Sequence, residues 1–141
     1  MKYHLRESPG FDLLRTAGLF KSSFAKQLRP HGVTPVQFAV LGLLWDRDGV
    51  FQHEIAEALH KDRPNVTRIL EKMESKGWVK RQKSTQDKRS ICVFLTNQGL
   101  KLKDQLEPLA LSFRKSAFEN LSSQEIQQLR YLLSKTMDNF L

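Results

Sequence analysis

The chain has 141 residues and a formal net charge of +8 at pH 7, with 40% hydrophobic and 27% charged residues. This length and balance fit one compact domain with appended elements and exclude a disordered or fibrous protein. The longest apolar stretch, residues 38–45, is far shorter than the ~20 residues that span a bilayer, and the N-terminus lacks the apolar core of a signal peptide. We therefore expect a cytoplasmic protein with no membrane partner. Its excess positive charge favours a polyanionic partner.

The first third of the chain is predicted to form two helices. The first begins at Ser8 and Pro9 and ends before Pro30, and its apolar residues fall on two stripes, which implies two packing partners. Thr34 then serves as the N-cap of a second helix that runs to about Asp46. Its apolar composition predicts that this second helix is largely buried.

Two short helices and a hairpin are predicted next. Residues 51–61 favour a short helix, and Asp62 can cap a further helix that ends near Gly77. After Gly77 the apolar residues change from helical spacing to alternation on both sides of a polar tip at residues 84–88. Helix, helix and β-hairpin therefore follow one another directly.

The C-terminal part is predicted to be helical again. Thr96 can cap a long helix, although Gly99 and Pro108 would weaken or kink it. Ser122 and Glu125 have the spacing of a capping box and predict the start of the last helix. The whole pattern is mainly α with a small β-hairpin.

Basic charge is concentrated in one part of the chain. Residues 61–90 hold ten basic and four acidic side chains, so most of the net positive charge lies in less than a quarter of the sequence. An α-helix fits the major groove of B-DNA, where side chains near its N-terminus reach base edges while the preceding helix braces it. The position of the charge therefore predicts a recognition helix followed by a basic hairpin beside the neighbouring minor groove.

The predicted contacts come from both the helix and the hairpin. Arginine and amide side chains can bond to guanine, adenine or phosphate, and threonine offers a hydroxyl and a methyl group. Arg89 is the best candidate for insertion into a minor groove. Phosphate would repel Asp87, so we expect it to support Arg89 or the hairpin turn through a salt bridge or an Asx hydrogen bond. The candidate DNA contacts are Arg63, Asn65, Thr67, Arg68 and Lys72 on the helix and Lys83, Lys88 and Arg89 on the hairpin.

Three segments carry a resemblance to a known family: HEIAEAL, RPNVTRILEKMESKGWVKR and DKRSICVFLTNQG. In this order they resemble the MarR family of bacterial transcriptional regulators. The family's wing signature, D-x-R followed by a strand and L-T-x-x-G, matches at Asp87, Arg89, Leu95, Thr96 and Gly99. The resemblance runs through residues 34–99, and the flanking helices agree with it in order and length.

The resemblance implies a winged helix-turn-helix DNA-binding lobe over residues 34–96. It also implies that residues 1–33 and 97–141 form helical dimerisation regions, so that a homodimer presents two recognition helices and wings to a pseudo-palindromic operator. Family members often bind small phenolic or anionic ligands in a crevice beside the dimer helices, which changes operator affinity. We therefore expect a homodimeric repressor of transcription that binds double-stranded DNA and responds to a small aromatic or anionic effector.

Four aromatic side chains are candidates for lining such an effector crevice: Phe20, Phe24, Phe38 and Trp45. Aromatic residues at helical spacing are more often core residues than ligand contacts. Cys92 lies in the middle of a predicted strand and favours packing over redox sensing. The four histidines lack metal-ligand spacing, so we expect no metal and no cofactor.

Other classes of function remain open at this point. The chain could be a constitutive or architectural DNA-binding protein without a ligand, or a basic interaction module for RNA or an acidic protein. RNA-binding modules usually place stacking aromatic residues on strands, whereas this hairpin is basic. Enzyme motifs such as G-x-S-x-G, a P-loop or H-E-x-x-H are missing from the sequence, so we do not expect an enzyme.

Overall fold

The computed structural model describes residues 1–87 and 89–141, so the expectation for Lys88 falls outside the described residues. The chain divides into two compact units, Met1–Glu107 and Pro108–Leu141. These units are defined by compactness alone. The functional division into residues 34–96 and two flanking regions stays a prediction.

The first unit begins with two helices whose bounds agree with the sequence prediction. Helix α1 spans Pro9–Leu28, between a short 3-10 turn at Leu5–Glu7 and another at Arg29–His31. Helix α2 spans Pro35–Asp46 and begins with a capping box: Gln37 N donates to Thr34 Oγ1 at 3.2 Å, and Thr34 N donates to Gln37 Oε1 at 3.0 Å. Both helix starts are confirmed.

Helices α3 and α4 form the predicted pair. Helix α3 spans Gln52–Leu59 and ends at His60, whose φ of 50° lies in the left-handed region. Helix α4 spans Arg63–Ser75, and its N-cap Asp62 accepts a hydrogen bond from Asn65 N at 2.8 Å. The left-handed conformation of His60 ends α3 and lets the chain turn into α4.

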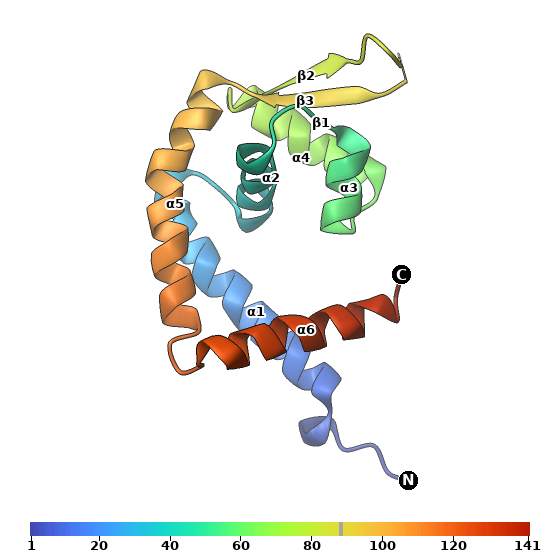
Figure 1. Cartoon of the computed structure of the whole chain (residues 1–141), viewed down its shortest axis with the longest axis vertical. Helices are drawn as coiled ribbons and strands as arrows, with labels where there is room; N and C mark the ends of the chain where they lie inside the picture. The colour runs from blue at the N-terminus through green and yellow to red at the C-terminus, as the bar shows by residue number, and fades with distance from the viewer. Residues whose placement is uncertain (88) are drawn as a thin grey trace. The chain divides into compact units, whose positions relative to one another are not determined.

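The sheet has three antiparallel strands, one more than the predicted hairpin. Strands β2 (Val79–Lys83) and β3 (Ile91–Leu95) form the hairpin, which lies beside α4, and β1 (Val50–Phe51) pairs on the other edge of β3 (Figure 1). Val50 lies opposite Val93. The sequence placed Phe51 at the start of a helix, and that detail is wrong: β1 is too short to show alternation, and its pairing partner lies far along the chain.

A continuous apolar core supports α4. Val66, Leu70 and Met73 are the fully buried residues of α4, which packs against β2 and α3. The opposite side of the helix therefore faces outward. The largest fully buried side chains include Leu28, Leu41, Leu44, Ile55, Val66, Leu70, Met73, Val93 and Leu106. Burial on this scale holds the outward face of α4 in a fixed position.

The junction where α5 begins ties several elements of the first unit together. Helix α5 spans Asn97–Ala117. Its N-cap Thr96 accepts from Gly99 N at 3.1 Å and donates to the carbonyl oxygen of Gly77 at 2.5 Å, while Trp45 Nε1 donates to the carbonyl oxygen of Gly99 at 3.1 Å. These bonds connect α2, the end of α4 and the start of α5. Further along, α5 continues as one helix through Pro108.

The second unit contains the rest of α5 and α6, which spans Ser123–Asp138. Ser122 Oγ accepts from Glu125 N at 3.1 Å and Glu125 Oε1 accepts from Ser122 N at 2.9 Å, so the predicted capping box is present. Several large apolar side chains of this unit are exposed, namely Leu111, Tyr131, Leu132, Leu133, Met137 and Phe140. Within the part of the chain that the structure describes, no helix is both long and apolar enough to cross a membrane.

Candidate nucleic-acid interface

The outward face of α4 carries most of the predicted helix contacts. Arg63, Arg68 and Lys72 are exposed. Asn65 is half-buried in the first turn. Its backbone N–H donates to the capping carboxylate of Asp62, and its side-chain amide takes no part in that hydrogen bond. Arg68 and Lys72 are four residues apart and lie on one face of α4, while Arg63 is the first residue of the helix. All three cations are exposed and can bind phosphate or base edges.

Thr67 differs from its neighbours because it contacts α3. Its side chain is half-buried, and its Oγ1 accepts a hydrogen bond from Nε2 of Gln52 at 2.7 Å. Gln52 is the first residue of α3, so this bond joins the two helices at the point where both face the hairpin. The sequence predicted a contact residue at Thr67 but gave no sign of its partner.

The hairpin turn is held together by Asp87. Its Oδ1 accepts from Arg89 N at 3.0 Å and its Oδ2 accepts from the hydroxyl of Ser90 at 3.1 Å, while Ser84 N donates to the carbonyl oxygen of Ser90 at 2.8 Å. Of the two interactions left open by the sequence, the Asx hydrogen bond is the one present. The side chains of Lys83 and Arg89 are exposed.

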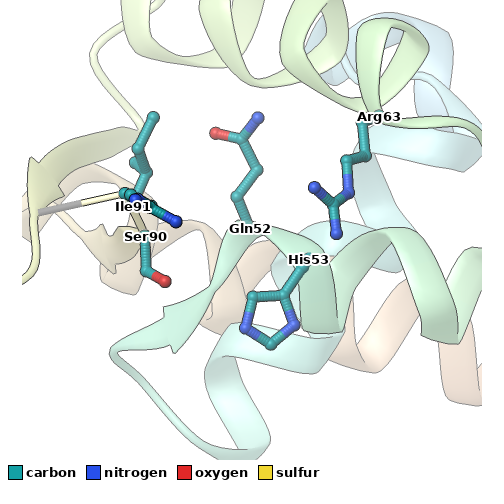
Figure 2. A pocket seen from close by; sticks show the side chains of 6 residues that line it. Gln52, His53, Arg63, Ser90 and Ile91 are labelled. Carbon is teal, nitrogen blue, oxygen red and sulfur yellow. The ribbon is translucent and has the colours of Figure 1, made fainter. Parts of the chain in front are cut away.

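A cleft of about 220 Å³ lies where α3, α4 and the hairpin meet. Its lining residues are Gln52, His53, Arg63, Arg89, Ser90 and Ile91. Figure 2 shows Gln52 standing between Arg63 on one side and Ser90 and Ile91 on the other, with His53 nearby. Arg63 and Arg89 are distant in sequence, yet they line the same cleft, so positive charge from the helix and from the wing acts on one spot.

Sequence reasoning missed Gln52 and His53 as members of this site. Both were interpreted as ordinary positions of a short helix, whereas the structure places them in its first turn, facing the cleft. The His53 ring stacks on Phe51, with ring centroids 5.3 Å apart and planes 10° from parallel. The usable signal was the missing cap: α3 begins without a Ser, Thr, Asp or Asn side chain bonded to its first turn, which leaves N–H groups available.

Some of the arginines form salt bridges with acidic side chains of the same chain. Among residues 1–87 and 89–141, ion pairs join Arg15 to Asp12, Arg47 to Glu54 and Arg81 to Glu74, the last at 3.2 Å. None of these pairs uses Arg63, Arg68 or Arg89. Their guanidinium groups are therefore available to an anionic partner. Arg68, Lys72 and Lys83 do not line the cleft and extend the basic surface beyond it.

Three of the four predicted effector residues pack against one another. Phe24 is buried and meets Phe38 edge to face at 5.1 Å, and Phe38 meets Trp45 edge to face at 5.9 Å. Phe20 is 41% exposed on α1. Three of the four therefore form a packed aromatic row between α1 and α2, as core residues do.

The side chains that commonly bind metals are dispersed in the part of the chain that the structure describes. The described residues contain no group of three or more His, Cys, Asp or Glu side chains placed to bind a metal ion. Cys92 is half-buried in β3, opposite Phe51 and Gln82 in neighbouring strands. These observations leave the basic surface as the site with a recognisable chemistry.

Two helices joined by a tight turn, with a hairpin directly after the second, define a winged helix-turn-helix protein. The comparisons agree with this class. The model of the MarR family matches residues 33–91. An uncharacterized HTH-type transcriptional regulator of Bacillus subtilis, YkoM, is 35% identical over 122 residues, which cover 84% of this chain and 79% of YkoM.

Solved structures extend the likeness to almost the whole chain. A mutant of MarR from E. coli complexed with operator DNA has a TM-score of 0.83 and 29% identity, covering 90% of this chain and 91% of that one. BpsR of Bordetella bronchiseptica has a TM-score of 0.89 and 26% identity, covering 98% and 99%. That structure is described as a mechanism for regulation of DNA binding by 6-hydroxynicotinic acid. The chain belongs to the MarR family of transcriptional regulators.

Proposed function

We propose that this chain is a sequence-specific, double-stranded DNA-binding repressor. The single observation that carries the proposal is the cleft in which Arg63 of α4 and Arg89 of the wing converge without acidic partners among the described residues. The proposed contacts are Arg63, Asn65, Thr67, Arg68, Lys72, Lys83, Lys88 and Arg89, with Asp87 holding the wing turn. A surface of this kind suits a major groove and an adjacent phosphate backbone.

The proposed assembly is a homodimer on a pseudo-palindromic operator. Support comes from large apolar side chains that are exposed, such as Leu14 and Leu19 on α1 and Leu132 and Met137 on α6. Exposed apolar area of this extent is typical of an interaction surface. A dimer with a two-fold axis would place two recognition helices on successive half-sites, as in other helix-turn-helix proteins.

The proposed control is a small aromatic or anionic ligand that alters operator affinity. The support is the similarity to BpsR, whose DNA binding is described as regulated by 6-hydroxynicotinic acid. The aromatic row of Phe24, Phe38 and Trp45, with Phe20 beside it in sequence, is the proposed lining. Titrating a panel of aromatic carboxylates, 6-hydroxynicotinic acid included, into a protein–operator complex tests this part. No response to any compound would favour a constitutive DNA-binding protein.

The central experiment is selection of bound fragments from genomic DNA, followed by a binding assay on the recovered duplexes. We expect recovered fragments to share an inverted repeat, because a symmetric dimer reads both strands alike. A reporter gene placed behind such a fragment distinguishes repression from activation. Equal binding to the duplex, to single-stranded RNA and to heparin at matched salt would contradict the proposal and favour a general basic interaction module.

Arg89→Ala tests the site itself. Removing the guanidinium should weaken binding to a recovered operator by about 1–3 kcal/mol and leave the fold intact, because the side chain is exposed. Arg68→Ala is the companion variant on α4. Titration of labelled operator gives the affinities, and circular dichroism reports the fold. If both variants bound as tightly as the parent protein, the assignment of this surface would be wrong.

A further inference from the structure

The cleft contains a buried polar atom with no partner in the described part of the chain. Gln52 Nε2 donates to Thr67 Oγ1 at 2.7 Å, whereas Gln52 Oε1 is buried and makes no hydrogen bond. Folded proteins rarely leave a buried acceptor unpaired, because its lost hydration is not replaced. An amide in this state at the meeting point of the recognition helix and the wing calls for a functional explanation.

The hydrogen bond from Gln52 determines what the hydroxyl of Thr67 can do. A threonine hydroxyl has one donor and two acceptor positions, and here the amide N–H occupies an acceptor position. Helical hydroxyls often donate to a carbonyl one turn back, as Thr136 does to Leu132 at 2.8 Å and Ser75 does to Lys72 at 2.7 Å. No such bond is made by Thr67 among the described residues. Its O–H is therefore left to donate to something outside its own helix.

The carbonyl end of the Gln52 amide faces the wing side of the cleft (Figure 2). Arg63 and Arg89 line the cleft together with Gln52. A guanidinium attracts the carbonyl end of an amide and repels its NH₂ end. Figure 2 shows Oε1 of Gln52 on the side of Ser90 and Ile91, the wing residues that follow Arg89, whereas Nε2 is bonded to Thr67.

We infer that Gln52 is a positioning residue for base recognition, which orients the Thr67 hydroxyl as a hydrogen-bond donor toward the DNA. This inference rests on the proposed function. In the major groove, guanine N7 and O6, adenine N7 and thymine O4 accept hydrogen bonds, whereas the amino groups of adenine and cytosine donate them. At the base pair that Thr67 contacts, the protein prefers a base that presents a hydrogen-bond acceptor. That preference depends on Gln52, which itself needs no contact with DNA.

Substitutions at Gln52 test the inference by changing the polarity of the bond. Gln52→Met keeps the length of the side chain and removes both polar groups. Gln52→Glu has no N–H, so its carboxylate accepts the proton of Thr67 and turns the outward side of that hydroxyl into an acceptor. The probe is a duplex recovered from genomic selection, together with copies in which each base pair is replaced in turn. Competition binding gives a preference at every position.

The expected results are specific to one base pair in each half-site. Gln52→Met should reduce the preference there by about fivefold, the value of one neutral hydrogen bond. Gln52→Glu should move the preference toward bases that present an amino group. Thr67→Val should reduce the same preference by a similar factor, and Gln52→Met added to Thr67→Val should change nothing further, since the two residues act through one bond.

Gln86→Glu is the charge-matched control. Gln86 lies in the wing turn and does not contact Thr67, so its substitution should lower affinity equally for all duplexes and preserve every preference. Gln52→Met and Gln52→Glu proteins that keep the preference of the parent at each position would overturn the inference while the proposed function stands. A parent protein with no sequence preference at all would overturn both.

Discussion

Among the glycines, Gly99 has the least space for a side chain. A Cβ added to it would lie 2.1 Å from the carbonyl oxygen of Trp78, which is a backbone atom. Its own carbonyl oxygen accepts the indole N–H of Trp45, and its N–H is bonded to Thr96. Two backbones therefore approach each other here as closely as glycine alone permits.

Gly99→Ala should lower the free energy of unfolding by about 1–3 kcal/mol, the range found for overpacked sites. Alanine favours a helix by about 1 kcal/mol over glycine, but a clash with a fixed backbone atom outweighs that gain. Gly42→Ala is the matched control, because the space around Gly42 in α2 is open and the same helical preference should there stabilise. Urea denaturation at one protein concentration compares the two. A Gly99→Ala protein as stable as Gly42→Ala would contradict the packing argument.

Single residues also show where reasoning from sequence reaches its limit. The support of the wing turn by Asp87 followed from local rules, since an Asx hydrogen bond joins residues close in sequence. The bond between Gln52 and Thr67 did not, because it depends on how α3 and α4 are arranged in space. The sequence identified Thr67 as polar and outward-facing, whereas its geometry depends on a residue that has no sequence signature.

Helices were predictable at the scale of elements because their ends carry local signals. Thr34, Asp62 and Ser122 each accept a backbone N–H in the first turn of a helix, and each helix begins where the cap predicts. Strand β1 lacked such a signal. It is defined by pairing with β3 through Val50 and Val93, and the alternation of a two-residue strand cannot be detected.

The start of α4 gives a prediction at this scale. Asp62→Ala removes the acceptor for Asn65 N and should lower the free energy of unfolding by about 1 kcal/mol. Asp62→Asn keeps an acceptor at the same place and should stay close to the parent in stability. Because Asp62→Asn also removes a negative charge beside the recognition helix, it should bind duplex DNA more tightly.

Thermal denaturation at matched protein concentration and operator titration at one salt concentration measure these two effects. The comparison separates the hydrogen bond of the cap from its charge. Equal stability of the alanine and asparagine proteins would show that the cap bond contributes nothing to α4.

At the scale of the whole molecule, the distribution of charge predicts how binding responds to salt. The net charge of +8 is concentrated around α4 and the wing, so affinity for duplex DNA should fall steeply as salt rises. Lys83→Ala should weaken binding to all duplexes similarly and make the slope of log affinity against log salt shallower by about one per protomer.

Lys115→Ala serves as the control for Lys83→Ala. Lys115 is exposed in the last turn of α5, outside the proposed interface, so the salt slope should not change. Binding isotherms measured at several salt concentrations give both slopes. An unchanged slope for Lys83→Ala would remove this residue from the phosphate contacts.

The junction at Thr96 has a mechanical consequence for the whole chain. Bonds from Thr96 and Trp45 join the first turn of α5 to α2 and to the end of α4, so hydrogen bonds fasten the start of α5 to the base of the wing. Pro108 has no N–H, so α5 lacks the hydrogen bond that would return to the carbonyl oxygen of Asp104. Helix α5 is therefore fastened by hydrogen bonds at its first turn and lacks one backbone hydrogen bond about one turn beyond Asp104.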